Sequence, residues 1–232
     1  MLSAQRISGL TAILASIMYV AVFSWLAVNF GYPDILDKNA AEVLVKLQQL
    51  GSNGRLVWGL YAFIPLLLLP VAVAVRNIVQ HSSVVLTLAM ITLSLSALVM
   101  HLGLLRWPSV MWYLAQSHEE VLVVSEQSKL IFDVSNIYLG NFLGELSGEI
   151  LMSVFFMLFG VACLQYKLCA RWVALYLLMS AVFTFAGSLR IFSENAKLIS
   201  DFNNLAMFIP ISFLIVGGII IINDRAVKSL SS

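Results

Sequence analysis

Long uncharged runs separated by short charged segments dominate the pattern of this chain. Five runs contain no Asp, Glu, Lys or Arg, and they cover residues 7–33, 56–75, 77–105, 172–189 and 202–223. A sixth apolar run, between Asp133 and Lys167, has 33 residues and only two charges, Glu145 and Glu149. Since ~20 apolar residues in a helix cross a bilayer, we expect transmembrane helices at about residues 8–30, 56–75, 82–105, 138–165, 172–190 and 204–223.

Composition supports the same class of protein. Hydrophobic residues make up 61% of the 232 residues and charged residues only 11%, against roughly 45–50% and about 25% in ordinary soluble domains. We therefore predict an all-α integral membrane bundle of six transmembrane helices, forming a single domain over residues 1–232. The first run is longer than a signal-peptide core and lacks a small-residue cleavage site, so we expect a retained helix.

The basic residues predict an orientation. If the N-terminus is cytoplasmic, the inner segments 1–7, 76–81, 166–171 and 224–232 hold six Lys and Arg in 28 residues. The outer loops 31–55, 106–137 and 190–203 hold seven in 71 residues. The positive-inside rule then favours an N-in/C-in topology with both termini in the cytoplasm.

The three expected outer loops are long enough to contain short interfacial helices. In the first loop, Ala40, Leu44 and Leu47 recur at helical spacing. In the second loop, three aromatic residues surround Pro108, namely Trp107, Trp112 and Tyr113. Such a cluster is typical of anchoring at headgroup depth. The alternative is a lid over a pocket that opens outward.

Prolines interrupt two of the expected helices. Pro65 and Pro70 lie in the second helix and Pro210 lies in the sixth. Each removes a backbone donor and bends the helix. Such bends either open a cavity or serve ordinary packing, since membrane helices tolerate proline.

The fourth expected helix carries two parallel ridges with a four-residue step. One ridge is small and consists of Gly140, Gly144 and Gly148; the other is polar and consists of Asn141, Glu145 and Glu149. Glycines at this spacing let a second helix approach closely. The fifth helix offers a matching small, polar ridge at Ser180, Thr184 and Ser188, so we expect these two helices to pack together beside a polar crevice.

The depth of the two acids distinguishes them. Counting ~20 residues back from Tyr166 places the outer boundary near residue 146. Glu145 then lies at the interface, and Glu149 lies about one turn, or ~6 Å, deeper. An acid within the hydrocarbon is expected to be paired, protonated or in contact with water, so Glu149 requires an explanation.

Candidate partners for the acids lie in one layer. Arg55, Arg106 and Arg190 stand at the expected outer ends of the second, third and fifth helices, and His101 lies about one turn below Arg106. They could form a charged cluster with Glu145 and Glu149. Alternatively, each arginine could extend to a lipid phosphate.

Specific catalytic chemistry is not indicated. A metal-dependent enzyme could combine His101, His118, Glu145 and Glu149, but the sequence has no HExxH and no second histidine at ligand spacing. We therefore assign no metal and no catalytic residue. Phosphate-binding glycine loops and basic nucleic-acid patches are also absent from the sequence, and the formal charge is +1. We expect no nucleic-acid partner and identify no cofactor.

Three segments carry a resemblance to a known family. They are Arg6 with Gly9, LRWPSVMWYLA at residues 105–115, and YLGNFLGEL at residues 138–146. They resemble the bacterial membrane family catalogued as domain of unknown function 4386. The distinctive residues are Arg106, Trp107, Pro108, Gly140, Gly144 and Glu145. The resemblance implies a multi-pass protein of the bacterial cytoplasmic (inner) membrane and supplies no activity. Relatives often have a histidine after the Gly-Glu pair, where this chain has Leu146.

Together these patterns predict a polar pocket open to the outer leaflet. Its expected binding residues are Asn141, Glu145, Glu149, His101, Arg106, Arg190 and Arg55. The leading hypothesis is non-enzymatic and is the binding or movement of a small molecule or lipid headgroup. A structural or regulatory membrane partner comes second, and an intramembrane metal-dependent enzyme third. The lipid bilayer is the one expected partner, and the sequence leaves the oligomeric state open.

Overall fold

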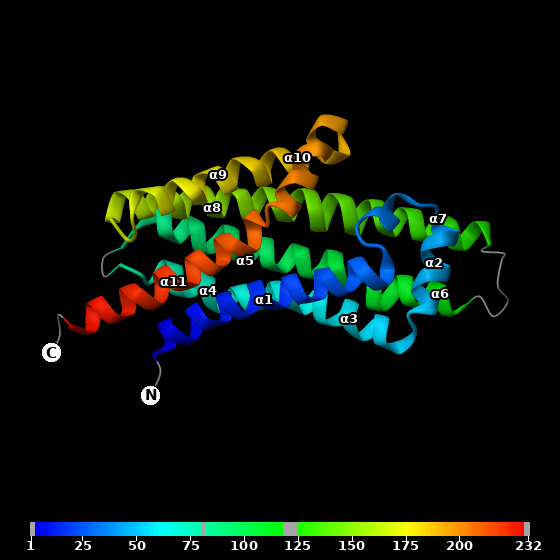
Figure 1. Ribbon diagram of the computed structural model, residues 1–232, viewed down its shortest axis with the longest axis horizontal. Coiled ribbons are helices and arrows are strands. Elements are labelled where there is room, and N and C mark those ends of the chain that lie inside the picture. Colours follow the sequence, from blue (N-terminus) through cyan, green and yellow to red (C-terminus); the bar gives the residue numbers. More distant parts are fainter. Residues whose placement is uncertain (1–2, 80–81, 118–124, 230–232) are drawn as a thin grey trace.

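The computed structural model describes residues 3–79, 82–117 and 125–229. Within these residues the chain is helical throughout, with short connections and no strand. The helices lie along one long axis, with the two termini at the same end (Figure 1).

Five segments are long and apolar enough to cross a membrane. They are α1 (Ala4–Phe30), the α3–η2–α4 segment (Gly51–Arg76), the α5–η3–α6 segment (Val84–Gln116), the α7–η4–α8 segment (Glu126–Tyr166) and the α9–η5 segment (Arg171–Ile191). A sixth is reached only when α10 (Glu194–Leu205) and α11 (Phe208–Ser229) are taken together, and these two are bent by 48°. The structure thus has five or six such helices, where the sequence predicts six.

Four of these five segments are made of shorter helical elements. They are α3 (Gly51–Phe63), η2 (Ile64–Leu67), α4 (Leu68–Arg76), α5 (Val84–Leu105), η3 (Trp107–Met111), α6 (Trp112–Gln116), α7 (Glu126–Ser135), η4 (Asn136–Ser147), α8 (Gly148–Tyr166), α9 (Arg171–Ser188) and η5 (Leu189–Ile191). Between α1 and α3 lie η1 (Asp34–Asp37) and α2 (Ala40–Gln49). The 3₁₀ segment η2 interrupts the second span at Pro65, which has no N–H to donate.

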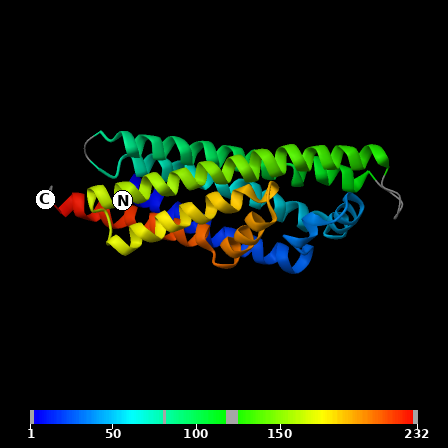
Figure 2. The ribbon, with the colours of Figure 1, turned by 90° about the horizontal axis from the view of Figure 1, so that it is seen from above.

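The fourth span is much longer than expected. It is helical from Glu126 to Tyr166, 41 residues, which corresponds to ~60 Å at 1.5 Å per residue. The hydrocarbon of a bilayer is only ~30 Å thick. The helix therefore begins well before residue 138, where the sequence predicted its start, and Figure 2 shows it running along most of the molecule.

Two π-helical segments interrupt the third and fourth spans. In η3 the Met111 amide donates to the Arg106 carbonyl at 2.8 Å, a five-residue step. At the end of η4 the Gly148 amide makes the same five-residue step to the Leu143 carbonyl. Such segments are rare and occur often at functional sites. They also change the angle between successive side chains, so the α-helical spacing assumed from the sequence does not hold across Asn136–Ser147.

The loop helices form a cap at one end of the bundle. α2, α6 and α7 gather at the end opposite the termini (Figure 1). The apolar face of α2 is buried at Val43, Leu44 and Leu47, and α2 contacts α6 and α7. The expected helix in the first loop is therefore present, with its apolar face packed on protein.

An aromatic cluster joins this cap to the spans. Trp107 stacks on Trp58 with ring centroids 4.5 Å apart and an interplanar angle of 15°, and Phe30 packs edge-on against both. Trp107 is 1% exposed, so its ring is packed against protein on all sides. Trp112 is partly buried, with Arg55 over its ring, and Tyr113 is 74% exposed.

Candidate functional site

A cavity of about 130 Å³ lies at the centre of the bundle. Its walls come from α1, α3, η2, α4, α5, η4, α8, η5, α10 and α11, together with one residue that follows α1 and one that follows α5. The polar lining residues are Ser16, Tyr19, Tyr32, Tyr61, Arg106, Glu145, Glu149, Arg190 and Asn204. This volume is several times the ~30 Å³ that one water occupies in the liquid, so the cavity has room for a ligand group larger than a few waters.

One wall of the cavity is an ion cluster built around Arg190. Its Nη1 and Nη2 donate to the two carboxylate oxygens of Glu149 at 2.7 and 3.0 Å. Nη2 also donates to Glu145 Oε2 at 2.9 Å. The side chains are 20%, 16% and 28% exposed for Arg190, Glu149 and Glu145, respectively. A bidentate arginine–carboxylate pair at these distances is among the strongest polar contacts in proteins.

Local structure explains why these three side chains meet. Glu145 is near the end of η4 and Glu149 is in the first turn of α8, so both project from neighbouring turns of one continuous helix. Arg190 follows the end of α9, where it also donates to the Gly187 carbonyl at 3.2 Å. α9 thus ends at the level of the acids, which brings its terminal cation beside them.

A second arginine faces the cavity without a carboxylate in contact. Arg106 is only 4% exposed. Its Nη1 donates to the Gly103 carbonyl at 2.7 Å and its Nε to Asn136 Oδ1 at 3.3 Å, and its guanidinium lies over the Trp107 ring at 5.2 Å. Among the described residues, no carboxylate lies within ion-pair distance of Arg106.

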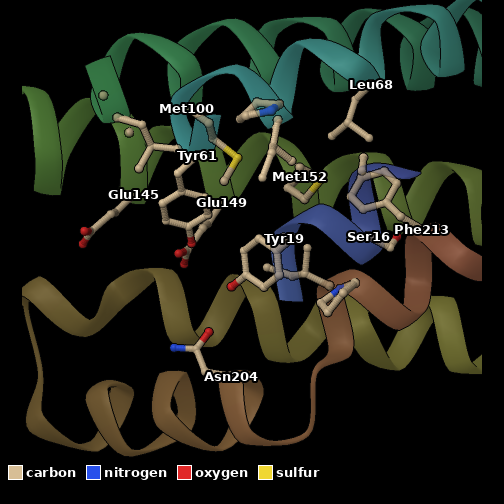
Figure 3. A pocket seen from close by; sticks show the side chains of 18 of the residues that line it. Ser16, Tyr19, Tyr61, Leu68, Met100, Glu145, Glu149, Met152, Asn204 and Phe213 are labelled. Atoms are coloured by element: carbon tan, nitrogen blue, oxygen red, sulfur yellow. The ribbon is translucent and has the colours of Figure 1, made fainter. Parts of the chain in front are cut away.

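Three tyrosines form the wall that faces the acids. Tyr61 lies between Tyr19 and Tyr32, with ring centroids 5.8 and 6.3 Å away, and its hydroxyl interacts with both of theirs. Burial raises the pKa of Tyr32, so that hydroxyl stays protonated. Figure 3 shows the carboxyl groups of Glu145 and Glu149 pointing into the space that Tyr19 and Asn204 also face.

The rest of the cavity is apolar. Leu68, Met152 and Phe213 lie away from the carboxylates in Figure 3. Ile64 with Pro65, and Ile209 with Pro210, line it from η2 and from the start of α11. Both proline-interrupted segments therefore border the cavity. The site joins a charged and aromatic end to an apolar end.

Three residues expected in the pocket are not part of its lining. Arg55 is exposed, and its Nε donates to the Pro108 carbonyl at 3.1 Å. His101 Nδ1 is 2.7 Å from the Ala62 carbonyl oxygen, and its ring lies 5.0 Å from that of Phe63. Asn141 is half-buried and does not line the cavity. Arg106, Arg190, Glu145 and Glu149 do line it.

The glycine ridge packs on a different helix from the one expected. A Cβ added to Gly103 on α5 would lie 2.5 Å from the Gly144 Cα, so the two backbones touch. A Cβ on Gly148 would lie 2.5 Å from Met100 Cγ on the same helix. The neighbour of this ridge is therefore α5, the third span, although α8 and α9 do pack together through other residues, among them Gly160 and Leu178. Small residues at both positions permit this close approach.

The polar residues of α9 do not face the cavity. The Ser212 hydroxyl of α11 donates to Ser180 Oγ at 2.9 Å, and the Ser188 hydroxyl donates to the Phe185 carbonyl at 2.7 Å. Thr184 is fully buried, and its hydroxyl has no hydrogen-bond partner among the described residues. None of the three lines the cavity.

Sequence reasoning missed the tyrosines and Asn204. Tyr19 stands in an otherwise ordinary apolar run, and Asn204 is the first residue of the expected sixth helix, next to the polar third outer loop. Neither position has a spacing that distinguishes it. The one available signal was Pro65 and Pro210, which mark the bends that border the cavity.

The described part of the chain contains no group of three or more His, Cys, Asp or Glu side chains that could hold a metal ion. His118, one of the histidines considered for a metal site, lies outside the described residues.

These features define a class of protein. The chain is all-helical, with multiple apolar helices that indicate a multi-pass membrane protein. It belongs to the family described as domain of unknown function (DUF4386), which matches residues 7–223. This confirms the resemblance drawn from the sequence. Comparison with curated proteins and with solved structures found no match.

Proposed function

We propose that this protein binds or moves a small amphiphilic molecule, or a lipid headgroup, in its central cavity. The observation that carries the proposal is the division of the cavity lining. The ion cluster of Arg190 with Glu145 and Glu149 stands at one end, and apolar side chains from η2, α4, α8 and α11 stand at the other. Ligand sites combine mostly apolar walls with a few convergent polar groups. Ionisable side chains among membrane-spanning helices are by default interpreted as part of a functional site.

We also propose six spans in the bacterial cytoplasmic membrane, with both termini in the cytoplasm. The higher density of Lys and Arg on that side supports this orientation. Both termini lie at the same end of the bundle (Figure 1). A fluorescent protein that matures only in the cytoplasm should fluoresce when fused to the C-terminus, and alkaline phosphatase fused there should be inactive. The opposite pair of results would reverse the topology.

Occupancy of the cavity can be tested directly. Ala15 lines the cavity and is 4% exposed, so Ala15→Phe should place a ring in the ligand's space. Leu14 is its neighbour in sequence and is 47% exposed on the outside of the bundle, which makes Leu14→Phe the matched control. Native mass spectrometry of detergent-purified protein would compare the three forms.

We expect a co-purified molecule on the wild-type protein and on Leu14→Phe, and its loss from folded Ala15→Phe. Equal occupancy of all three proteins would place the ligand outside the cavity. An empty wild-type protein that also gains no mass from added lipid would leave the structural or regulatory alternative as the better account. Elution volume in size-exclusion chromatography would verify that each variant is folded.

A further inference from the structure

Arg106 lines the cavity and has an unused donor. Its hydrogen bonds, to Gly103 and Asn136, use Nη1 and Nε, and Nη2 makes none with the described residues. A buried cation costs several kcal/mol unless charges or dipoles compensate it. Two neutral oxygens compensate this one only in part, since an arginine has five N–H donors. An anionic oxygen of a ligand would complete the compensation of this guanidinium.

Glu145 has an unused acceptor that faces the same cavity. Arg190 binds both oxygens of Glu149 but only Oε2 of Glu145. Among the described residues nothing donates to Glu145 Oε1, and its side chain is the more exposed of the two acids, 28% against 16%. Glu149 is therefore fully engaged in the ion cluster, while Glu145 keeps one oxygen available for a donor.

The charges that line the cavity balance. Glu145 and Glu149 carry two negative charges, and Arg106 and Arg190 carry two positive charges. A ligand with a net charge would leave an uncompensated charge in a low-dielectric site, which is costly. A ligand that is neutral overall but dipolar would satisfy Arg106 and Glu145 together and preserve the balance.

The aromatic and apolar walls narrow the choice further. Tyr19, Tyr32 and Tyr61 present rings beside the acids, and aromatic faces attract ammonium groups. Leu68, Met152 and Phe213 supply an apolar surface at the other end. A molecule that uses every wall has an anionic group, an ammonium group and a hydrocarbon chain.

We propose that the cavity binds the zwitterionic headgroup of an aminophospholipid, with the phosphodiester at Arg106 and the ammonium between Glu145 Oε1 and the tyrosines. This inference rests on the proposed function, because it names the ligand class of the same cavity. A free phosphorylated amine shares the polar chemistry. The apolar wall favours the lipid, since only the lipid brings a chain to cover it.

The experiment is a native mass spectrometry titration of the full-length protein after delipidation. Three probes separate the parts of the proposal: phosphatidylethanolamine, phosphatidylglycerol with the same chains, and free phosphoethanolamine. The variants are Arg106→Gln, Arg106→Lys and Glu145→Gln. Lys129→Gln is the control, because Lys129 forms a surface pair with Glu126 outside the cavity.

We expect wild-type protein to bind phosphatidylethanolamine at least tenfold more tightly than either other probe. Arg106→Gln and Glu145→Gln should each reduce this affinity about tenfold or more, Arg106→Lys should reduce it less, and Lys129→Gln should leave it unchanged. The comparison of the three probes on wild-type protein decides the question even if an Arg106 variant does not fold.

Other outcomes separate the two proposals. Equal affinity for phosphatidylglycerol would overturn the zwitterionic assignment and leave a cavity that binds amphiphiles. Equal affinity for phosphoethanolamine would overturn the lipid as the source. Binding of no probe, with no other molecule retained from the membrane, would overturn both the ligand class and the proposed function.

Discussion

Removing the guanidinium of Arg190 while both acids remain would expose how much the ion cluster contributes to stability. Arg190→Gln deletes three charge-assisted hydrogen bonds, at 2.7, 2.9 and 3.0 Å. It also leaves Glu145 and Glu149 as like charges on neighbouring turns. Removing one partner of a buried pair typically costs about 3–5 kcal/mol. Because the three side chains are 16–28% exposed, we expect the lower end, ~3 kcal/mol, or about two decades in the unfolding equilibrium.

The assay is equilibrium unfolding in mixed micelles of a mild and a denaturing detergent, followed by tryptophan fluorescence. Lys129→Gln is the matched control, since it also removes one cation. The Lys129–Glu126 pair is exposed, with its carboxylate 88% accessible, and such pairs contribute about 0.2–1 kcal/mol. The two substitutions should therefore differ by ~2 kcal/mol or more.

A double-mutant cycle identifies the partner. Glu149→Gln added to Arg190→Gln removes both ends of the two-pronged pair, so it should restore part of the lost stability. We expect a coupling energy of ~1–3 kcal/mol, the range for residues in direct contact. If Arg190→Gln instead unfolds like Lys129→Gln, or if the two changes simply add, the cluster does not hold the fold and the reasoning above is wrong.

Three further predictions follow from individual contacts. Gly140→Ala should weaken phosphatidylethanolamine binding, because its Cβ would lie 2.6 Å from the Arg106 Cζ, whereas Gly59→Ala has nothing within 4 Å and should bind normally in the same titration. Trp58→Ala should lower the free energy of unfolding by ~3–5 kcal/mol, because the ring is fully buried; a loss under ~1 kcal/mol in micelle unfolding would contradict the packing. Burial raises the pKa of the Cys169 thiol, so maleimide labelling should be slow at neutral pH and accelerate only above the usual thiol range of about 8.5; rapid labelling at pH 7 would contradict it.

The helices could be predicted from the sequence because apolar run length alone determines them. Five of the six apolar runs lie in helical segments long enough to cross a membrane, whereas residues 202–223 span the break between α10 and α11. The first run matched closely, with α1 covering Ala4–Phe30 against an expected 8–30. The end of the fourth span could not be predicted in this way. The apolar run predicted a helix over residues 138–165, whereas this helix begins at Glu126 beside the loop helices. Because other parts of the protein pack against it there, the length of this helix is not limited by the thickness of the bilayer.

Only some of the contacts in the site could be predicted from residue spacing. Spacing places Glu145 and Glu149 on neighbouring turns, and it identifies Gly144 as a point of close approach. It does not say which helix approaches, since α5 and α9 both carry small residues. The identity of the acids' partner depended on where α9 ends, because Arg190 reaches them only from that position. Arg106 lies in the same cavity but is held by Gly103 and Asn136.

The difference in length between neighbouring helices accounts for the position of the site. α8 and its extension continue past the level where α9 stops, so the acids would lie uncovered without a further element. α10 turns back at that level, and Asn204 faces the cavity from it. Its outer face carries Leu198, Phe202 and Leu205, which are 68%, 49% and 82% exposed. Exposed apolar residues of this size suit contact with lipid better than contact with water. Asn204 therefore faces the polar end of the cavity from a helix whose other face is apolar and exposed, which supports the proposed binding of an amphiphile.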